Sequence, residues 1–298
     1  MAALSILRPG MLTTVQDEGR WGFQSRGVPV SGAMDWYSHR LANQLLGNDR
    51  AVATLEVTLM GPQIRFETST AVAVTGADFH LTLDDVPVAM NRMIEVTAGG
   101  ILKFGERLRG ARAYVAVRGG IDVPIILGSR STHVLTRLGG HEGRALKAGD
   151  MIAIGVRGEG TPRPLALTPF TYRTKLRVIP AQERLFAQLC TQQFRVSPQS
   201  DRMGYRLDGG NVADAPTGER MSVALPTGAI QVPPTGKPIV LMNDHATTGG
   251  YALAGAVITA DLPIAGQLAP GDWIEFEACS LETADAALRK RERQLDAA

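Results

Sequence analysis

The sequence has few cysteines and few aromatic residues. It contains 2 cysteines among 298 residues, and aromatic side chains make up 5% of the total. Cys190 and Cys279 each stand beside apolar residues, and neither has a second cysteine or a histidine at the spacing of a metal site. We therefore expect two buried, reduced thiols and no bound metal, rather than a disulfide-stapled secreted domain or a zinc-binding module.

An excess of charge of one sign is also lacking. The chain has 31 Lys+Arg against 29 Asp+Glu, a net charge of +2, which is far less than binding to nucleic acid or to an anionic membrane requires. The basic run at 289–293 is expected to form the solvated face of a helix. Glycine and proline interrupt every apolar segment, and residues 1–10 contain no apolar run of signal-peptide length. We expect a cytoplasmic enzyme or binding protein with no nucleic-acid and no membrane partner.

Several catalytic and nucleotide-binding signatures are absent. Gly236-Lys237 is followed by Pro238, so the Ser or Thr that holds magnesium in a P-loop is missing. No dinucleotide-binding glycine fingerprint follows a strand-like segment, no Gly-x-Ser-x-Gly elbow occurs, and His141-Glu142 lacks the second histidine of a zinc protease. The methionine-lysine-methionine setting of a biotinylated lysine is missing as well. If the protein uses ATP or biotin, a partner or a less standard geometry must hold it.

What the sequence does contain is many short strand-like segments. Its 33 glycines and 17 prolines separate them. A two-residue beat or a short apolar run marks the stretches 71–75, 79–83, 101–104, 112–118, 151–154, 239–242 and 273–276. Many short strands joined by glycine-bearing turns indicate a mainly β protein, built as a sandwich or barrel rather than from alternating βαβ units.

Three helices are predicted. The first covers 34–46 and stops at Gly47, as glycine-capped helices do; Pro180 opens the second, and Thr283 caps the last. Apolar residues at helical spacing define their buried sides. These residues are Met34, Tyr37, Leu41 and Leu45 in the first helix, Leu185, Phe186 and Leu189 in the second, and Leu281, Leu288 and Leu295 in the last.

An internal similarity suggests duplication. Residues 146–152 and 268–274 share a leucine, a Gly-Asp turn and a following strand-like segment. Between them, residues 155–169 are rich in Gly, Pro, Arg and Thr, as a linker is. We therefore predict two β-rich domains, residues 1–165 and residues 166–298, the second ending in the last helix.

Three stretches carry more polar side chains than turn formation requires. They are residues 13–20, 200–204 and 244–251. Each places hydroxyls, amides or paired charges beside glycines, a composition suited to gripping a small polar ligand. Our central hypothesis is that these stretches converge on one pocket.

The strongest candidate is the loop that follows the stretch 239–242. Asp244 or His245 suits acid–base chemistry, and two adjacent glycines allow backbone N–H groups to converge on an anion. A tight turn capped by Asp and Thr is the structural alternative, but a turn needs only one or two such residues. We assign catalytic roles to Asp244, His245, Thr247 and Thr248, and ligand binding to Gly249, Gly250 and Tyr251.

The other ligand-binding candidates each have a structural alternative. Asp17 and Arg20, three residues apart, are expected to form an ion pair, and Ser31 suits a helix cap as well as an anion seat. Asn43 suits a bond to a loop as well as to a ligand. Arg202 suits a carboxylate or phosphate clamp or a charged hairpin, and an inward Glu56 would need a partner. The candidates are Thr14, Gln16, Asp17, Arg20, Ser31, Gly32, Asn43, Glu56 and Arg202.

Seven motifs occur in one order along almost the whole chain. They are Thr13-Thr14-Val15-Gln16-Asp17-x-Gly19-Arg20, Ser31-Gly32-Ala33-Met34-Asp35, Leu55-Glu56, Gly128-Ser129-Arg130-Ser131-Thr132, Ser200-Asp201-Arg202-Met203-Gly204, Gly228-Ala229-Ile230-Gln231-Val232-Pro233 and Thr247-Thr248-Gly249-Gly250-Tyr251. In these motifs the sequence resembles the biotin-dependent carboxyltransferase family, also called allophanate hydrolase subunit 2. The resemblance implies two cyclophilin-like β-barrel domains with a few short helices, and it adds Gln231 to the ligand-binding candidates.

The resemblance also implies a function and a set of partners. It implies a subunit of an ATP-dependent 5-oxoprolinase, a hydrolase that acts on a small cyclic amide together with a companion subunit of the KipI or allophanate hydrolase subunit 1 type and a third subunit. ATP would bind with the partner subunits. A first alternative is a carboxyltransferase subunit acting on urea or a related amide, which would need biotin on a separate carrier. A second is a non-enzymatic antagonist of a kinase inhibitor, which would bind its partner without turnover.

Overall fold

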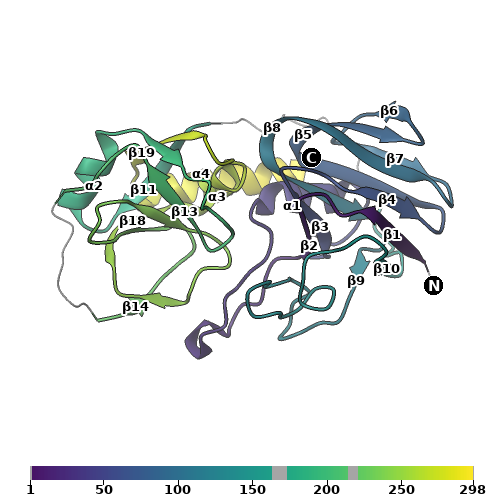
Figure 1. The fold of residues 1–298 in the computed structure, drawn as a ribbon, viewed down its shortest axis with the longest axis horizontal. Helices are drawn as coiled ribbons and strands as arrows, with labels where there is room; N and C mark the ends of the chain where they lie inside the picture. The colour runs from purple at the N-terminus through teal and green to yellow at the C-terminus, as the bar shows by residue number, and fades with distance from the viewer. Residues whose placement is uncertain (1, 163–172, 214–220, 298) are drawn as a thin grey trace. The chain divides into compact units, whose positions relative to one another are not determined.

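The computed structural model describes residues 2–162, 173–213 and 221–297 (Figure 1). The chain divides into two compact units, each made of separate segments. The first unit comprises Met1–Arg20, Ser31–Phe170 and Leu295–Ala298, and the second comprises Trp21–Val30 and Thr171–Gln294. Of the predicted linker at 155–169, residues 163–169 lie outside the described residues, as does the predicted domain boundary near residue 165.

The first unit is built on a ten-stranded sheet. The path β2-β3-β8-β4-β1-β10-β9 runs through it, with β5 paired to β8 and both β6 and β7 paired to β5. All pairs are antiparallel, which suits a chain whose strands follow one another through short turns. The strands are β1 Ala3–Arg8, β2 Leu12–Gln16, β3 Thr54–Thr58, β4 Gln63–Phe66, β5 Thr70–Leu83, β6 Val86–Val88, β7 Met93–Val96, β8 Ile101–Val117, β9 Ile121–Asp122 and β10 Met151–Ile154.

Strands β5 and β8 are each longer than predicted, because each one includes two segments that were predicted as separate strands. The predicted strands 71–75 and 79–83 are both part of β5, and 101–104 and 112–118 both fall on β8, which ends at Val117. Register shifts after Gly76 and Asp78 mark β-bulges, which allow a strand to continue where the apolar alternation breaks. Beneath the sheet, Leu4, Leu55 and Val115 are fully buried in one core.

The second unit contains a closed barrel. Its strands follow the order β11-β18-β15-β16-β13-β12-β19, and a separate two-stranded sheet pairs β14 with β17. Ile230, Val240 and Phe194 are fully buried, as expected where the short apolar runs of neighbouring strands fill a small barrel. The strands are β11 Lys175–Pro180, β12 Phe194–Val196, β13 Gly204–Asp208, β14 Val223–Ala224, β15 Ala229–Val232, β16 Ile239–Leu241, β17 Thr248–Gly249, β18 Ala252–Val257 and β19 Trp273–Ala278. The predicted mainly β, barrel-containing fold class is confirmed.

The helices follow the predictions in part. The described residues form α1 Trp36–Leu45, α2 Glu183–Cys190, α3 Leu262–Gly266 and α4 Leu281–Ala297, with short 3-10 turns η1 Gln24–Arg26 and η2 Thr259–Asp261. The predicted buried residues of the first two helices are all buried. Pro180 closes β11 instead of opening α2. The short helix α3 was not predicted.

The start of α4 was predicted wrongly. Ser280, not Thr283, caps the helix, because the Ser280 hydroxyl accepts the backbone N–H of Thr283 at 3.2 Å. The helix therefore begins at Leu281, whose side chain is 72% exposed, whereas Leu295 is fully buried as expected. Leu288 is half-buried and packs against the buried cluster that includes Ile258 and Cys279.

The internal sequence similarity corresponds to a repeated local structure. In the turn before β10, Asp150 Oδ2 accepts the backbone N–H three residues earlier at 2.7 Å, and in the turn before β19 Asp272 does the same at 2.8 Å. Gly149 and Gly271 hold φ of 91° and 95°, a region that favours glycine. Each glycine N–H also donates to a neighbouring strand, to Ile6 or Val196, at 2.8 Å. The two Gly-Asp motifs therefore form the same turn once in each unit.

The two cysteines differ in exposure. Cys279 is buried, as expected, but Cys190 at the end of α2 is exposed, so the expectation of two buried thiols was wrong for Cys190. Neither forms a disulfide. Among the residues that the structure describes, no helix has the length and apolar character that crossing a membrane requires.

Candidate functional site

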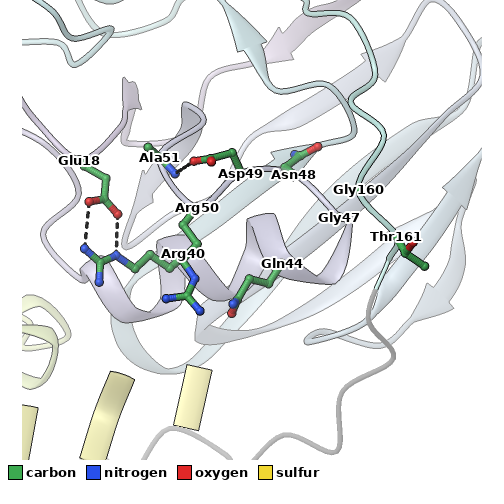
Figure 2. A pocket seen from close by; sticks show the side chains of 10 residues that line it. All are labelled: Glu18, Arg40, Gln44, Gly47, Asn48, Asp49, Arg50, Ala51, Gly160 and Thr161. Carbon is green, nitrogen blue, oxygen red and sulfur yellow. Dashed lines mark hydrogen bonds and ion pairs between the residues drawn. The ribbon is translucent and has the colours of Figure 1, made fainter. Parts of the chain in front are cut away.

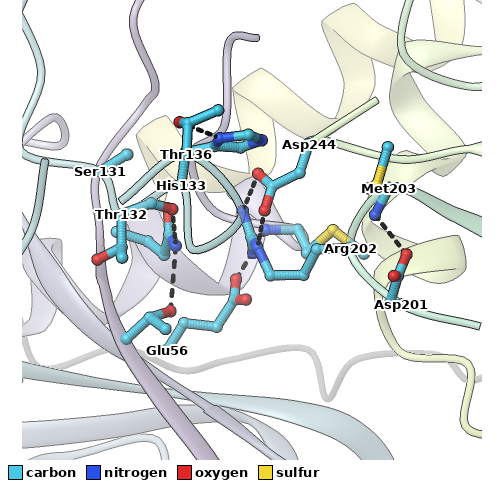
Figure 3. A network of polar contacts seen from close by, with 12 residues as sticks. Glu56, Ser131, Thr132, His133, Thr136, Asp201, Arg202, Met203 and Asp244 are labelled. Atoms are coloured by element: carbon cyan, nitrogen blue, oxygen red, sulfur yellow. Dashed lines mark hydrogen bonds and ion pairs between the residues drawn. The ribbon is translucent and has the colours of Figure 1, made fainter. Parts of the chain in front are cut away.

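Asp244, in the loop between β16 and β17, forms a buried ion pair with Arg202, which lies between β12 and β13. Arg202 donates from Nε and Nη2 to the two carboxylate oxygens of Asp244 at 2.9 and 3.0 Å (Figure 3). Both side chains are almost wholly buried, and the Asp244 backbone N–H donates to the Arg202 carbonyl. This paired geometry fixes the position of the carboxylate. From sequence, Arg202 was a candidate clamp for a ligand carboxylate or phosphate. In the structure, two of its guanidinium N–H donors bind Asp244 instead.

His245 lies next to this pair with both ring nitrogens in contact with a polar atom. Nδ1 lies 2.7 Å from the Ala246 carbonyl oxygen, and Nε2 lies 3.3 Å from the Thr227 hydroxyl. A carbonyl oxygen only accepts, so Nδ1 carries the hydrogen and Nε2 keeps its lone pair. Burial lowers the pKa of His245 below its ordinary value of 6.5. At neutral pH, His245 therefore offers a neutral imidazole with a basic Nε2.

The two glycines of this loop are explained differently from the sequence prediction. Gly249 lies in β17, paired with Val223 of β14, and neither Gly249 nor Gly250 is among the described glycines with positive φ. A Cβ at Gly249 would lie 2.7 Å from Gln231 Nε2 and 2.7 Å from Leu225 Cδ1. Close packing against two flexible side chains, rather than a turned anion nest, thus favours glycine at 249.

The remaining members of this loop are more open. Thr248 and Tyr251 are exposed, and Thr247 is half-buried with its carbonyl accepting the Leu225 N–H. Gln231 is only 6% exposed, and its Nε2 has no hydrogen-bond partner. A buried donor without an acceptor is unusual and favours a ligand-facing role. The second unit thus brings Arg202 together with Asp244, beside His245, and it brings Gln231 together with Gly249.

In the first unit, Asp17 is the centre of a second polar cluster. Its carboxylate accepts from the Gly19 and Arg130 backbone N–H groups and from the hydroxyls of Ser129 and Ser131, at 2.5 to 2.8 Å. Arg20 Nη2 donates to the Ser131 carbonyl. Asp17 and Arg20 therefore both hold the segment that contains Ser131.

Gln16 and Thr14 belong to the same cluster. Gln16 Nε2 donates to the Thr14 hydroxyl and to the Thr132 carbonyl, both at 3.0 Å. Gln16 Oε1 is buried without a partner. Thr132 in turn donates from its backbone N–H and its hydroxyl to the Val15 carbonyl. These bonds join β2 to residues 129–132, more than 110 positions away, a link that no local sequence pattern reveals.

Glu56 points inward and has partners. Its carboxylate accepts from the Tyr114 hydroxyl and from the Met34 backbone N–H, both at 2.8 Å, and Arg112 Nε lies 3.9 Å away. Burial, followed by the charges of Glu56 and Asp35, raises the pKa of Tyr114 well above 10. The strand Thr54–Thr58 thus carries a satisfied buried carboxylate, and Glu56 ties the start of α1 to the sheet.

Ser31 and Asn43 have structural roles here. Asp35, not Ser31, caps α1, because its Oδ1 accepts the Ser38 N–H at 2.9 Å; the alternative of Ser31 as helix cap was wrong. Ser31 instead has φ of 58°, and the adjacent Gly32 approaches Gly19 so closely that a Cβ would lie 2.9 Å from its nitrogen. Asn43 Nδ2 donates to the Val52 carbonyl at 2.7 Å, the loop contact weighed for it from sequence.

Several functional candidates were missed from sequence. His39 lies in α1 and is fully buried, with Nδ1 3.0 Å from the Thr54 hydroxyl and Nε2 unpartnered. Thr227 and His133 were missed as well, because single Thr and His residues carry no motif. Within residues 2–162, 173–213 and 221–297, no group of three or more His, Cys, Asp or Glu side chains is arranged to hold a metal ion. The expected meeting of the polar clusters around one pocket stays a prediction.

A polar cavity of about 720 Å³ is lined by Arg40 and Gln44 of α1 and by residues 47–51 that follow the helix, together with Glu18, Gly160 and Thr161 (Figure 2). Its charged groups already have partners. Arg40 donates to both carboxylate oxygens of Glu18, at 2.5 and 2.9 Å, Asp49 accepts the Ala51 N–H, and Arg50 pairs with Asp296. None of the residues predicted to bind a ligand lines this cavity, and we assign it no ligand.

Comparison with known proteins gives consistent matches. A family model described as "Carboxyltransferase domain, subdomain A and B" matches residues 26–278. The chain is 39% identical to the C subunit of 5-oxoprolinase from Escherichia coli (strain K12) over 299 residues, which cover 98% of this chain and 96% of that protein. It is also 48% identical to the urea amidolyase of Lachancea kluyveri over 151 residues, 50% of this chain and 8% of that protein.

A solved structure matches along nearly the entire chain. The crystal structure of the K. lactis urea amidolyase superposes with a TM-score of 0.91 at 34% identity, covering 99% of this chain. The matched part is 20% of the amidolyase chain. The present chain therefore spans about a fifth of that enzyme but almost the full length of the Escherichia coli protein.

Proposed function

Because the chain belongs to the family of the carboxyltransferase domain, subdomains A and B, we propose that it is a subunit of an ATP-dependent 5-oxoprolinase. The carrying observation is the 39% identity along 98% of this chain to a protein named as the C subunit of 5-oxoprolinase. The match covers 96% of that protein, so it extends beyond a single shared motif. The family resemblance drawn from the sequence is confirmed.

In the proposed reaction the lactam of 5-oxoproline opens to glutamate. ATP, bound with companion subunits, would supply the phosphoryl group that activates the lactam oxygen. The charges beside the candidate site are already paired, Arg202 with Asp244, which supports placing the nucleotide elsewhere in the complex. What remains for this chain is to position the small amide and to handle a proton.

We assign the proton to His245. Its Nε2 lone pair takes a proton from the water that attacks the activated carbonyl carbon, a role for which a neutral imidazole is suited at pH 7. The lactam C–N bond then breaks and the ring nitrogen takes up a proton to become the amine of glutamate. A second water releases the phosphoryl group of the resulting acyl phosphate as inorganic phosphate. Two hydrogen bonds from Arg202 fix the Asp244 carboxylate. This keeps the loop between β16 and β17 in place and keeps the Asp244 carboxylate close to the imidazole of His245. Gln231 Nε2 and the hydroxyls of Thr247 and Thr248 donate to substrate oxygens as charge develops on them.

The test is an assay of the assembled enzyme. The chain is co-expressed with its companion subunits, and glutamate release from 5-oxoproline is measured with and without ATP. We expect ATP-dependent release that His245→Gln lowers at least about 100-fold, the usual scale of lost acid–base catalysis. Release that persists unchanged in the His245→Gln complex would remove this histidine from the mechanism, and a complex that releases no glutamate would contradict the function.

A second candidate function is carboxyl transfer to urea or a related amide. It is supported by the 48% identity over half of the chain to a urea amidolyase. This reaction needs biotin on a separate carrier, because the sequence lacks the setting of a biotinylated lysine. Retention of the assembled complex on avidin, with urea-dependent loss of the carboxyl group from carboxybiotin, would favour it over the lactam hydrolase.

A further inference from the structure

Residues 123–138 in the first unit have the reverse of the usual burial pattern. Their small polar side chains are inside: Ser129, Ser131, Thr132 and His133 are at most 2% exposed. Four of their large apolar side chains are outside, with Ile125 61%, Leu127 40%, Val134 40% and Leu135 72% exposed, whereas Val123 is buried. A loop in contact only with water gains nothing from this arrangement, because apolar area stays wet while polar groups lose their hydration. We call residues 123–138 the presenting segment.

The presenting segment is held rigidly from below. Asp17 accepts the Arg130 N–H and two serine hydroxyls, and Arg130 donates to the Val123 carbonyl at 2.7 Å and to Asp122 at 2.9 Å. His133 Nδ1 contacts the Thr136 hydroxyl at 2.7 Å (Figure 3). These contacts explain the polar motif at 13–20 without a ligand. Residues 13–20 therefore support the presenting segment through hydrogen bonds.

The backbone of the presenting segment is also strained. Leu127 and Arg137 hold φ of 52° and 54°, a region that residues with a Cβ rarely adopt. Two β-bridges, Ile126 with Ser129 and His133 with Leu138, close the turns around them. Such a backbone persists only where the surroundings fix it, and it is characteristic of functional surfaces. The exposed leucines are therefore fixed in position rather than loosely arranged.

We propose that the presenting segment is the docking surface for the apolar face of a companion subunit. The occupant follows from chain length: this chain corresponds to 96% of a protein named as a subunit, yet to only 20% of the urea amidolyase, in which further protein belongs to the same chain. In a complex of separate subunits, a companion chain would supply part of that further protein. Exposed apolar side chains together with an exposed charged residue such as Arg137 in the same segment are typical of such interfaces.

This inference rests on the multi-subunit part of the proposed function, and the test separates the two. Wild-type chain and variants are co-expressed with the companion subunits of the same organism, and the dissociation constant of the complex is measured with purified components. Leu135→Ser and Ile125→Ser should each weaken binding at least tenfold. The matched control is Leu108→Ser, which changes a 56% exposed leucine of β8 outside the presenting segment and should stay within twofold of wild type. Circular dichroism melting confirms that each variant is folded.

Three outcomes overturn the proposal. Leu135→Ser and Ile125→Ser that bind the companion like wild type refute the surface while leaving the proposed function intact. A wild-type chain that binds no companion refutes the surface together with the multi-subunit assignment, whereas glutamate release tests the activity separately. Self-association of the chain alone that Leu135→Ser abolishes would assign the surface to a second copy instead.

Discussion

His39 is a buried residue whose protonation should control acid stability. Burial lowers its pKa to about 4, against the opposing charges of Glu18 and Asp17. In the unfolded chain its pKa is about 6.5, so between these values the unfolded chain binds a proton that the fold excludes. The stability contributed by the neutral ring is therefore complete above pH 6.5 and is lost as the pH falls from 6.5 to about 4, a change of about 3 kcal/mol.

The comparison that checks this uses His39→Asn, which keeps a polar group near Thr54 but does not titrate. Urea unfolding of both proteins at pH 7.5 and pH 4.5 gives four free energies of unfolding. Wild type should lose more stability than the variant over this interval. Equal losses in the two proteins would show that the acid sensitivity arises from other groups.

Replacing only Arg202 should lower the free energy of unfolding more than replacing both Arg202 and Asp244. Arg202→Met leaves a buried carboxylate without its two charged donors, and such losses reach about 3–5 kcal/mol. Adding Asp244→Leu removes the stranded charge, so the double variant should recover most of that stability, as measured by urea unfolding. A double variant less stable than Arg202→Met would mean that Asp244 has other essential partners.

At the scale of elements, β17 contacts β15 closely because Gly249 of β17 has no side chain where it faces Gln231 of β15. Gly249→Ala places a methyl group 2.7 Å from Gln231 Nε2 and from Leu225 Cδ1, so these flexible side chains must move. The loss of stability should be small, because both contacted atoms are the ends of flexible side chains. We expect turnover of the assembled enzyme to fall more than the stability loss explains, because Gln231 is displaced from its proposed ligand-facing position.

The matched control for this change is Gly158→Ala in the first unit. A Cβ at Gly158 meets nothing within 4 Å, and this glycine has no positive φ. Its turnover and melting temperature should equal those of wild type. Equal turnover of Gly249→Ala and wild type would indicate that Gln231 has no part in the reaction.

The elements also show how far sequence patterns reach. Short strands and the buried stripes of α1 and α2 follow from local periodicity, which depends only on neighbouring residues. Local pattern failed where a tertiary contact or a bulge decides: β5 continues past Gly76, and Leu281 is exposed at the start of α4. Motifs likewise identified Arg202 and Asp244 as polar sites but not as a pair, since they lie 42 positions apart.

At the scale of the whole molecule, the sequence predicted a mainly β protein because short strands and glycine-bearing turns are distributed along the entire chain, and the family resemblance implied that the strands form barrels. It did not predict that the polar motif at 13–20 anchors residues 129–132. That link depends on which hydrogen-bond donors and acceptors meet in space. The Asp17 carboxylate accepts four hydrogen bonds, two from backbone N–H groups and two from serine hydroxyls. Polar composition alone cannot separate a ligand site from such an anchor.

The last prediction concerns what the chain does by itself. Its sequence has no P-loop, since Pro238 follows Gly236-Lys237, and the charged groups of its polar cavity are paired with one another. We therefore expect the purified chain to release no ADP from ATP, with or without 5-oxoproline, whereas the assembled complex releases ADP in proportion to glutamate. A coupled ADP assay run beside glutamate detection measures both.

The His245→Gln chain is the control, because a contaminating ATPase would be unaffected by that change. ADP release by the isolated wild-type chain that depends on 5-oxoproline and disappears in His245→Gln would place the nucleotide site in this chain and contradict the division of labour proposed for the complex.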